Sequence, residues 1–191
     1  DVADFRERLC EAAQRLFADK GPDAVTMRQL AVELGVSPMT PYRYFKDKDD
    51  LLAAVRASGF ERFARDVEAA YAVPGDARAK GLAVREAYLA FAFGNPQAYK
   101  LMFDLNQPNE ADYPALVDAA HRAKASMSQY VQGLVEAGVM EGDPEQIGLM
   151  FWAATHGAVG LELVGKLPQG EARRLIGAMS SAIARGLRPQ A

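Results

Sequence analysis

The sequence predicts an all-α protein, and three observations lead to that prediction. Apolar residues recur every three or four positions through nearly the whole chain, which is the periodicity of amphipathic helices. Glycine, proline and polar capping residues separate these periodic stretches from one another. No stretch shows the alternation expected of a strand, and the chain contains no internal repeat or low-complexity tract.

The first predicted helix carries an apolar stripe from Phe5 to Phe17 and ends at Gly21. The next begins with a capping box, in which the Thr26 hydroxyl accepts from a first-turn N–H and Gln29 reaches back to the cap. This helix is short, because Gly35 supplies a positive-φ ending about one turn later.

A fresh helix start follows at Ser37-Pro38, which offers a cap and a proline suited to the first helical position. Asp47, with Asp50 three residues later, then begins a longer helix that is expected to end near Tyr71. The periodicity predicts further helices at about 78–93 and 116–135, with a shorter one between them that follows 94–96 and ends near 103, and a loop at 106–109. Another helix starts at the cap 143–146, and residues 168–170 separate it from a last helix that ends near 187.

Composition sets limits on what the protein does. The 191 residues, half of them hydrophobic, are enough to bury a core in one large or two small domains. The single cysteine, Cys10, rules out an internal disulfide framework, and with only two histidines we expect no metal centre and no cofactor. Cys10 lies on the inward stripe of its helix and is expected to be a small core residue.

The chain is not expected to associate with a membrane. Its most relevant uncharged stretch, residues 146–161, is shorter than the roughly 20 apolar residues of a membrane span. The acidic N-terminus does not resemble a secretory signal, so a cytoplasmic setting is expected. A net charge of −3 argues against indiscriminate nucleic-acid binding, although a local basic patch still permits binding at a specific site.

Residues 26–48 have the spacing of a helix-turn-helix. Ala31 is small where two helices would cross, Gly35 makes the turn, and Leu30, Leu34 and Val36 would pack inward. Such a pair presents its second helix to the major groove of DNA. Positive charge is concentrated in the same segment, where four basic residues oppose two acidic ones for a local charge of +2.

The segment resembles the N-terminal domain of tetracycline-repressor-type (TetR family) regulators over about residues 5–60. The matching positions are Phe17, Gly21, Thr26, Leu30, Ala31, Gly35, Val36, Ser37, Thr40, Tyr42, Arg43, Tyr44, Phe45, Lys48, Leu51 and Leu52. A second stretch, from Phe151 to Leu163, resembles a Trp/His/Gly signature found in a subset of the C-terminal domains of this family. The resemblance implies an all-helical homodimer with a three-helix DNA-binding domain and a larger helical domain for ligand binding and dimerisation.

The resemblance also implies roles for individual residues on a double-stranded DNA operator. Thr26 would bond a phosphate, and Arg28 could reach a base edge, where its fork suits guanine. Four further side chains would hold backbone phosphates: Ser37, Thr40, Tyr42 and Lys48. Three would contact base edges or thymine methyls: Met39, Arg43 and Tyr44.

Pro41 departs from the family pattern, which usually has an aliphatic residue there. If Ser37 is the cap, Pro41 falls at the fourth helical position, where its missing N–H removes the first intrahelical bond. Either the cap lies nearer Pro38 or the second helix of the motif starts irregularly.

We expect a DNA-binding domain at 1–48 and an effector-binding and dimerisation domain at 49–191, connected by the helix at 47–71. The segment from Gln146 to Leu161 is apolar all round, so both of its faces should be covered, one of them by a second copy where Gly157 and Gly160 permit close approach. The last helix could complete this interface through Ile176, Met179, Ile183 and Leu187.

A small-molecule effector would be recognised by aromatic, methionine and a few polar side chains, which form adaptable apolar walls. The candidates are Phe91, Tyr99, Phe103, Met127, Tyr130, Phe151, Trp152, Thr155 and His156. Each could equally be plain core, and His156 is as readily explained as a hydrogen-bonded interior histidine. His121 is expected to be solvated.

No catalytic constellation is present in the sequence, so an enzyme is not predicted. The favoured function is a sequence-specific transcriptional regulator, a repressor released from a palindromic operator by a largely apolar effector. Two alternatives remain: a regulator whose DNA binding the effector promotes, and a helical ligand- or partner-binding dimer without a DNA function.

Overall fold

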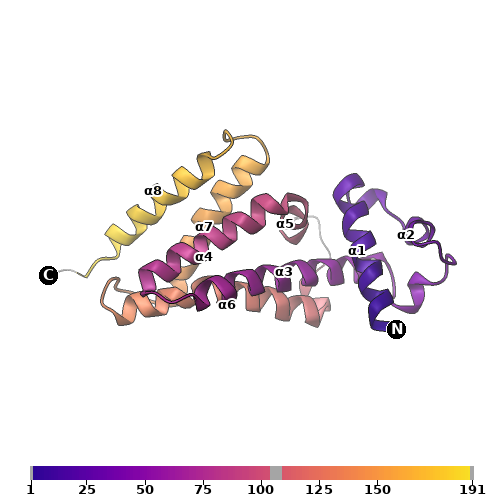
Figure 1. Ribbon diagram of the computed structural model, residues 1–191, viewed down its shortest axis with the longest axis horizontal. Helices are drawn as coiled ribbons and strands as arrows, with labels where there is room; N and C mark the ends of the chain where they lie inside the picture. Colours follow the sequence, from indigo (N-terminus) through magenta and orange to yellow (C-terminus); the bar gives the residue numbers. More distant parts are fainter. Residues whose placement is uncertain (1, 104–108, 190–191) are drawn as a thin grey trace. The chain divides into compact units, whose positions relative to one another are not determined.

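The computed structural model describes residues 2–103 and 109–189, and these residues form helices and connecting turns without a β-strand, as predicted (Figure 1). The α-helices are α1 (Val2–Lys20), α2 (Met27–Glu33), α3 (Lys48–Ala72), α4 (Ala77–Gly94), α5 (Pro96–Met102), α6 (Pro114–Glu136), α7 (Pro144–Leu163) and α8 (Glu171–Gly186). Three 3-10 turns accompany them: η1 (Pro22–Ala24), η2 (Pro41–Arg43) and η3 (Glu110–Asp112). Most of the loop predicted at 106–109 lies outside the described residues.

Local capping chemistry explains where the N-terminal helices begin and end. The capping box of α2 is present: Gln29 N–H donates to the Thr26 hydroxyl, and Thr26 N–H donates to the Gln29 amide oxygen at 2.8 Å. Gly35 has a φ of 66°, the left-handed conformation that its predicted role requires. Asp47 caps α3, since Asp50 N–H donates to its carboxylate at 2.9 Å.

The segment between α2 and α3 differs from the prediction. An α-helix was expected to begin at Ser37-Pro38, but the chain between α2 and α3 forms only turns and the 3-10 helix η2 at Pro41–Arg43. Pro41 causes the difference, because it has no N–H to donate to the Ser37 carbonyl. That carbonyl instead accepts from Thr40 N–H at 2.9 Å, one residue earlier than an α-helix would require. The sequence left open either a cap nearer Pro38 or an irregular start of the second helix, but the described segment between α2 and α3 forms no α-helix.

The described chain divides into two compact units. The first comprises Asp1–Arg62 and Gln97–His121, and the second Phe63–Pro96 and Arg122–Ala191. Both α3 and α6 contribute residues to each unit. No helix among the described residues is sufficiently long and apolar to cross a membrane.

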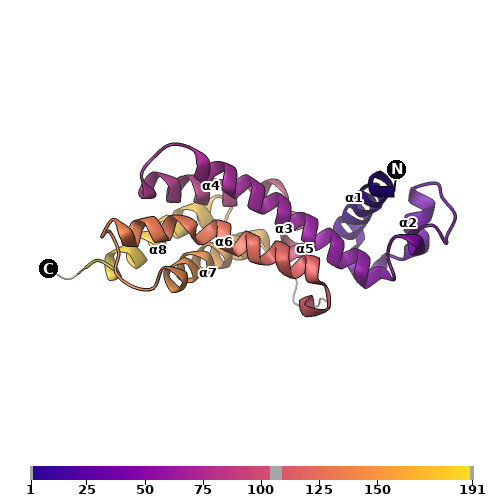
Figure 2. The same cartoon turned by 90° about the horizontal axis from the view of Figure 1, so that it is seen from below.

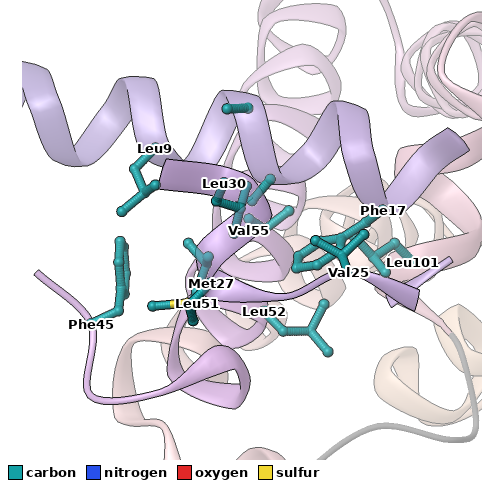
Figure 3. Close-up of a cluster of buried hydrophobic side chains, with 12 residues drawn as sticks. Leu9, Phe17, Val25, Met27, Leu30, Phe45, Leu51, Leu52, Val55 and Leu101 are labelled. Carbon is teal, nitrogen blue, oxygen red and sulfur yellow. The ribbon is translucent and has the colours of Figure 1, made fainter. Parts of the chain in front are cut away.

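The core of the first unit joins α1, α2, α3 and α5 (Figure 3). Its apolar side chains are Leu9, Ala12, Ala13, Phe17, Val25, Met27, Leu30, Phe45, Leu51, Leu52, Val55 and Leu101. Leu30 and Ala31 are fully buried, as the helix-turn-helix spacing predicts. Cys10 packs against this core, and burial raises the pKa of its thiol to about 11, which keeps it protonated and unreactive near neutral pH.

The second unit contains a hairpin of α7 and α8, which lie side by side and are joined by residues 164–170 (Figures 1 and 2). Glu162, near the end of α7, accepts from the backbone N–H groups of Gly170 and Ala172 at 2.8 Å each and so fixes the start of α8. Val131, Leu134, Met140 and Ile147 form a cluster at the other end of α7. These contacts hold α7 and α8 in a fixed arrangement within the second unit.

Candidate functional site

The helix-turn-helix segment presents a group of uncovered side chains from α2 and the residues before and within η2. Met39 and Tyr42 are 67% and 48% exposed. Arg28, Ser37 and Arg43 are also exposed. Exposed methionine, tyrosine and arginine side chains are suited to contact with thymine methyls, phosphates and guanine edges.

Two buried residues hold this irregular segment in place. Pro41 is buried, and Phe45 is 1% exposed within the core of the first unit. Figure 3 shows the Phe45 ring pointing from the chain before α3 toward the helix that carries Leu9. The Arg6 guanidinium lies over the same ring, 4.7 Å from its centroid. The segment is therefore positioned by side-chain packing at both ends of η2 in place of a regular α-helix.

Three predicted DNA-contacting side chains already have partners within the first unit. The Thr26 hydroxyl belongs to the capping box, and Lys48 Nζ donates to the Pro22 carbonyl at 3.1 Å. The Tyr44 ring packs against Phe5, with ring centroids 4.9 Å apart. Each of these contacts gives its residue a structural role within the first unit. The DNA contacts of the three residues remain predictions.

Lys46 was not among the predicted contact residues, although it is exposed and follows η2 closely. Its backbone N–H donates to the Asp50 carboxylate at 2.9 Å, which fixes the chain at the entrance to α3. The local excess of positive charge was the sequence signal that could have identified it, since Lys46 is one of the four basic residues counted there.

Five of the nine predicted ligand-contacting residues surround a small cavity of about 30 Å³ in the second unit: Met127, Tyr130, Phe151, Trp152 and Thr155. Val84, Arg85 and Tyr88 of α4 complete its lining. The sequence reasoning missed these three residues. Their positions at 84, 85 and 88 follow helical spacing, but only the packing of α4 against α7 brings them to the cavity.

His156 lies next to this cavity. Its Nδ1 is 3.4 Å from the Tyr88 hydroxyl, and its ring centroid is 6.4 Å from that of Trp152. Loss of solvent around the half-buried ring lowers the pKa of His156 below its usual value, so the ring is neutral at pH 7. The geometry agrees with the hydrogen-bonded interior histidine that the sequence suggested.

His156 should make stability depend on pH. Because the folded-state pKa is lower than the unfolded one, the unfolded chain binds more protons between these two values, and the free energy of unfolding falls as the pH drops below about 6.5. We expect His156→Gln to reduce this loss, measured by urea denaturation between pH 7.5 and about 5. His121→Gln, which replaces an exposed histidine, is the control and should follow the wild type. An unchanged pH dependence in His156→Gln would contradict the prediction.

The other three ligand candidates do not line this cavity. Phe91 is buried and packs edge-to-face on Phe63, with centroids 5.2 Å apart. Tyr99 and Phe103 belong to the first unit, where Phe103 packs edge-to-face on Phe60 at 5.5 Å. Each of the three thus has a packing role that the sequence could not distinguish from ligand contact.

A stripe of apolar and small residues on α7 is exposed in the single chain. We call it the α7 stripe: Leu149, Met150, Ala153, Gly157, Leu161 and Val164. Leu161 and Val164 are 45% and 62% exposed. A side chain at Gly157 would meet nothing within 4 Å. Contiguous exposed apolar surface of this kind marks an interaction site.

One expectation about α8 is wrong. Ile176 was predicted to complete an interface with a second copy, but it is fully buried within its own chain. Leu187 likewise packs against the cluster at the start of α7. Met179 and Ile183 are only half-buried in the single chain, so their place in an interface stays a prediction.

Comparisons with known proteins agree with this geometry. A family model described as bacterial regulatory proteins of the tetR family matches residues 9–55. A second, described as a tetracyclin repressor-like C-terminal domain, matches residues 82–183. An HTH-type transcriptional regulator of Staphylococcus aureus is 43% identical over 51 residues. That match covers 27% of this chain and 28% of the relative.

Solved structures match nearly the whole chain. A protein of unknown function from Rhodococcus sp. RHA1 is 31% identical, with a TM-score of 0.82 over 96% of this chain and 95% of that one. The fatty acid degradation regulator FadR of Bacillus halodurans has a TM-score of 0.77 at 16% identity, covering 97% of both chains, a likeness of fold alone. With the C-terminal family model covering more than half of the sequence, the chain belongs to the TetR family of bacterial regulatory proteins.

Proposed function

We propose that this protein is a homodimeric, sequence-specific DNA-binding repressor that a small molecule releases from its operator. The observation that carries the proposal is the exposed, locally basic helix-turn-helix surface within the matched DNA-binding domain. Arg28 and Arg43 are its candidate base-reading side chains, together with Met39 and Tyr44. Thr26, Ser37, Thr40, Tyr42 and Lys48 are its candidate phosphate contacts.

Dimerisation is proposed through the α7 stripe. A two-fold axis would place this self-complementary apolar surface against its copy, which is the geometry of a closed dimer. Two recognition segments about 34–36 Å apart would then reach successive major grooves, and the operator would be roughly palindromic. Gly157 supports this arrangement because it lets a second backbone approach closely.

Effector control is proposed through the second unit, where the cavity beside His156 and its aromatic walls supply a ligand-sensitive region. Binding there would shift the population of dimers toward one whose DNA-binding domains do not fit the operator, provided that the ligand prefers that state. Helix α3 is the candidate coupling element, because its residues belong to both units. Within the first unit, Arg56 of α3 is 4% exposed and donates to the Met102 carbonyl at 3.1 Å while pairing with Glu110.

The proposal is tested by fluorescence-anisotropy titration with DNA from upstream of the protein's own gene, at several salt concentrations and against scrambled DNA. Tight, sequence-dependent binding that weakens with salt is expected. Arg28→Ala should weaken operator binding by about 1–3 kcal/mol if Arg28 reads a guanine, without changing dimerisation.

Arg15→Ala is the matched control, since it removes the same charge from an exposed position on α1. An equal loss of operator affinity in the two variants would mean that Arg28 contributes only its positive charge and does not read a base. Binding no better than to scrambled DNA, with and without candidate effectors, would contradict the proposed function. An effector that strengthens operator binding would instead make the protein a co-repressed regulator or an activator.

A further inference from the structure

An open groove with a volume of about 370 Å³ lies in the second unit between α4 and α8. Small-molecule sites commonly have volumes of about 300–1,000 Å³, so the groove can hold a compact ligand. We call it the arginine groove. Its lining consists of Ala77, Arg78, Gly81, Leu82, Arg85, Tyr130, Leu134, Val139, Met140, Phe151, Gly177, Ser180, Ser181, Ala184, Arg185 and Arg188.

The walls of the arginine groove are apolar. Leu82 and Val139 line the groove and are 47% and 48% exposed, so both offer apolar surface to a ligand. Beneath them, Leu134 and Met140 are each 5% exposed and form part of a hydrophobic cluster. A ligand with an apolar body would cover these side chains and gain the free energy of removing them from water.

Two glycines define the space in the groove. At Gly81 a side chain would lie 2.8 Å from the Tyr130 ring, so α4 packs directly on that ring and closes the groove on one side. At Gly177 on α8 a side chain would meet nothing within 4 Å. The α8 side of the groove therefore has open space next to Gly177, and a larger side chain at this position is expected to occupy part of the groove.

Positive charge dominates the rim. Four arginines line the groove: Arg78 and Arg85 from α4, Arg185 from the last turn of α8, and Arg188 from the residues just after α8. The groove lining contains no aspartate or glutamate. Arg85 is held by Glu86 at 3.1 Å. Among the described residues, the guanidinium groups of Arg78, Arg185 and Arg188 form no ion pair. The chain as a whole has a net charge of −3, so the positive charge of the groove lining is a local feature.

The groove shares three of its lining residues, Arg85, Tyr130 and Phe151, with the small cavity beside His156. The Tyr130 and Phe151 rings lie 6.3 Å apart and form a wall common to both. A molecule that displaced either ring would therefore change the packing of α6 against α7 around the cavity. This shared wall links occupancy of the groove to the proposed effector region.

We propose that the arginine groove binds an amphipathic anion, with its carboxylate or phosphate held by the arginines and its apolar body against Leu82 and Val139. Guanidinium forks match both head groups because each accepts two parallel N–H bonds. The identification of this molecule as the effector rests on the proposed function, whereas its binding to the groove does not.

Binding is tested by isothermal titration calorimetry of the full chain, without DNA, using decanoate, decyl phosphate and the neutral decanol. At least one of the two anions is expected to bind about tenfold or more tightly than decanol, because charge-assisted hydrogen bonds contribute about 1.5–3 kcal/mol. The tighter of the two anions identifies the preferred head group.

Three variants locate the site. Replacing Arg185 at the end of α8 together with Arg188 just beyond it, as Arg185→Gln with Arg188→Gln, should weaken binding of the anion about tenfold or more. Gly177→Phe should abolish binding by filling the groove while leaving the chain folded. Arg174→Gln removes a charge from an exposed α8 residue outside the groove and should bind as the wild type does.

Equal binding of decanol and both anions, undiminished binding in the double arginine variant, or no binding of any probe would overturn the proposal. A separate anisotropy titration then asks whether the bound anion releases operator DNA. If the anion binds but the operator is never bound, the proposed function fails and the groove assignment stands. If the operator is bound and the anion binds without affecting it, the groove is not the effector site.

Discussion

Leu161→Asp is expected to convert the proposed dimer into monomers and to weaken operator binding by about a hundredfold or more. The substitution places a carboxylate within the α7 stripe, and a two-fold interface would contain it twice. Hot-spot residues of interfaces contribute about 2 kcal/mol or more each, and desolvating two unpaired charges adds to that cost. Dimer dissociation should therefore increase by about three orders of magnitude.

Folding of the single chain should not change, because Leu161 is 45% exposed there and most exposed substitutions alter stability by less than about 0.5 kcal/mol. Multi-angle light scattering gives the mass in solution, and far-UV circular dichroism checks the helix content. Val73→Asp is the matched control: Val73 is 56% exposed and lies outside the stripe, so this variant should remain dimeric. A Leu161→Asp protein that is still a dimer would place the interface elsewhere.

Much of the fold could be predicted from the sequence because the rules involved are local. The Thr26–Gln29 capping box and the positive φ of Gly35 depend on a few neighbouring residues, and both are present. Asp143 caps α7 in the same way, with its carboxylate accepting from the N–H groups of Glu145 and Gln146. A helix start or end could be predicted wherever the capping side chain and the backbone group that it bonds are only a few residues apart in the sequence.

Non-local packing explains what the sequence did not predict. The apolar character of α7 was evident, but only the packing of α8 decides that Leu161 is exposed while Val159 is fully buried. The arginine groove depends on residues about 100 positions apart on two helices. Its one sequence signal was the seven-residue spacing of Arg78 and Arg85, which puts these two arginines on one face of α4.

The irregular segment around η2 combines local and non-local effects. Its irregular backbone has a local cause, whereas the positions of its side chains depend on packing against distant residues. Pro41 prevents the α-helical bond to Ser37, so the exposed side chains between α2 and α3 cannot rely on a continuous backbone hydrogen-bond ladder. Their positions depend instead on Phe45, which anchors the chain just before α3. This dependence makes Phe45 the residue whose removal should most affect both stability and DNA binding.

Phe45→Ala is accordingly expected to destabilise the first unit by about 3–5 kcal/mol, the usual cost of removing a fully buried phenylalanine. It should also weaken operator binding, since Arg43 and Tyr42 would lose their fixed positions. Urea denaturation followed by far-UV circular dichroism measures the loss. Trp152, the single tryptophan, reports separately on the second unit through its fluorescence, so unfolding of the first unit can be distinguished.

Tyr42→Ala separates the two consequences. Tyr42 is a neighbouring aromatic residue that is 48% exposed, so its removal should change the free energy of unfolding by less than about 0.5 kcal/mol. Operator binding should still weaken if its hydroxyl contacts a phosphate. Equal stability losses in the two variants would mean that Phe45 is not the anchor. A stable Phe45→Ala protein with normal operator affinity would mean that the segment is held by its backbone turns alone, because packing at position 45 would then contribute nothing to the DNA-binding surface.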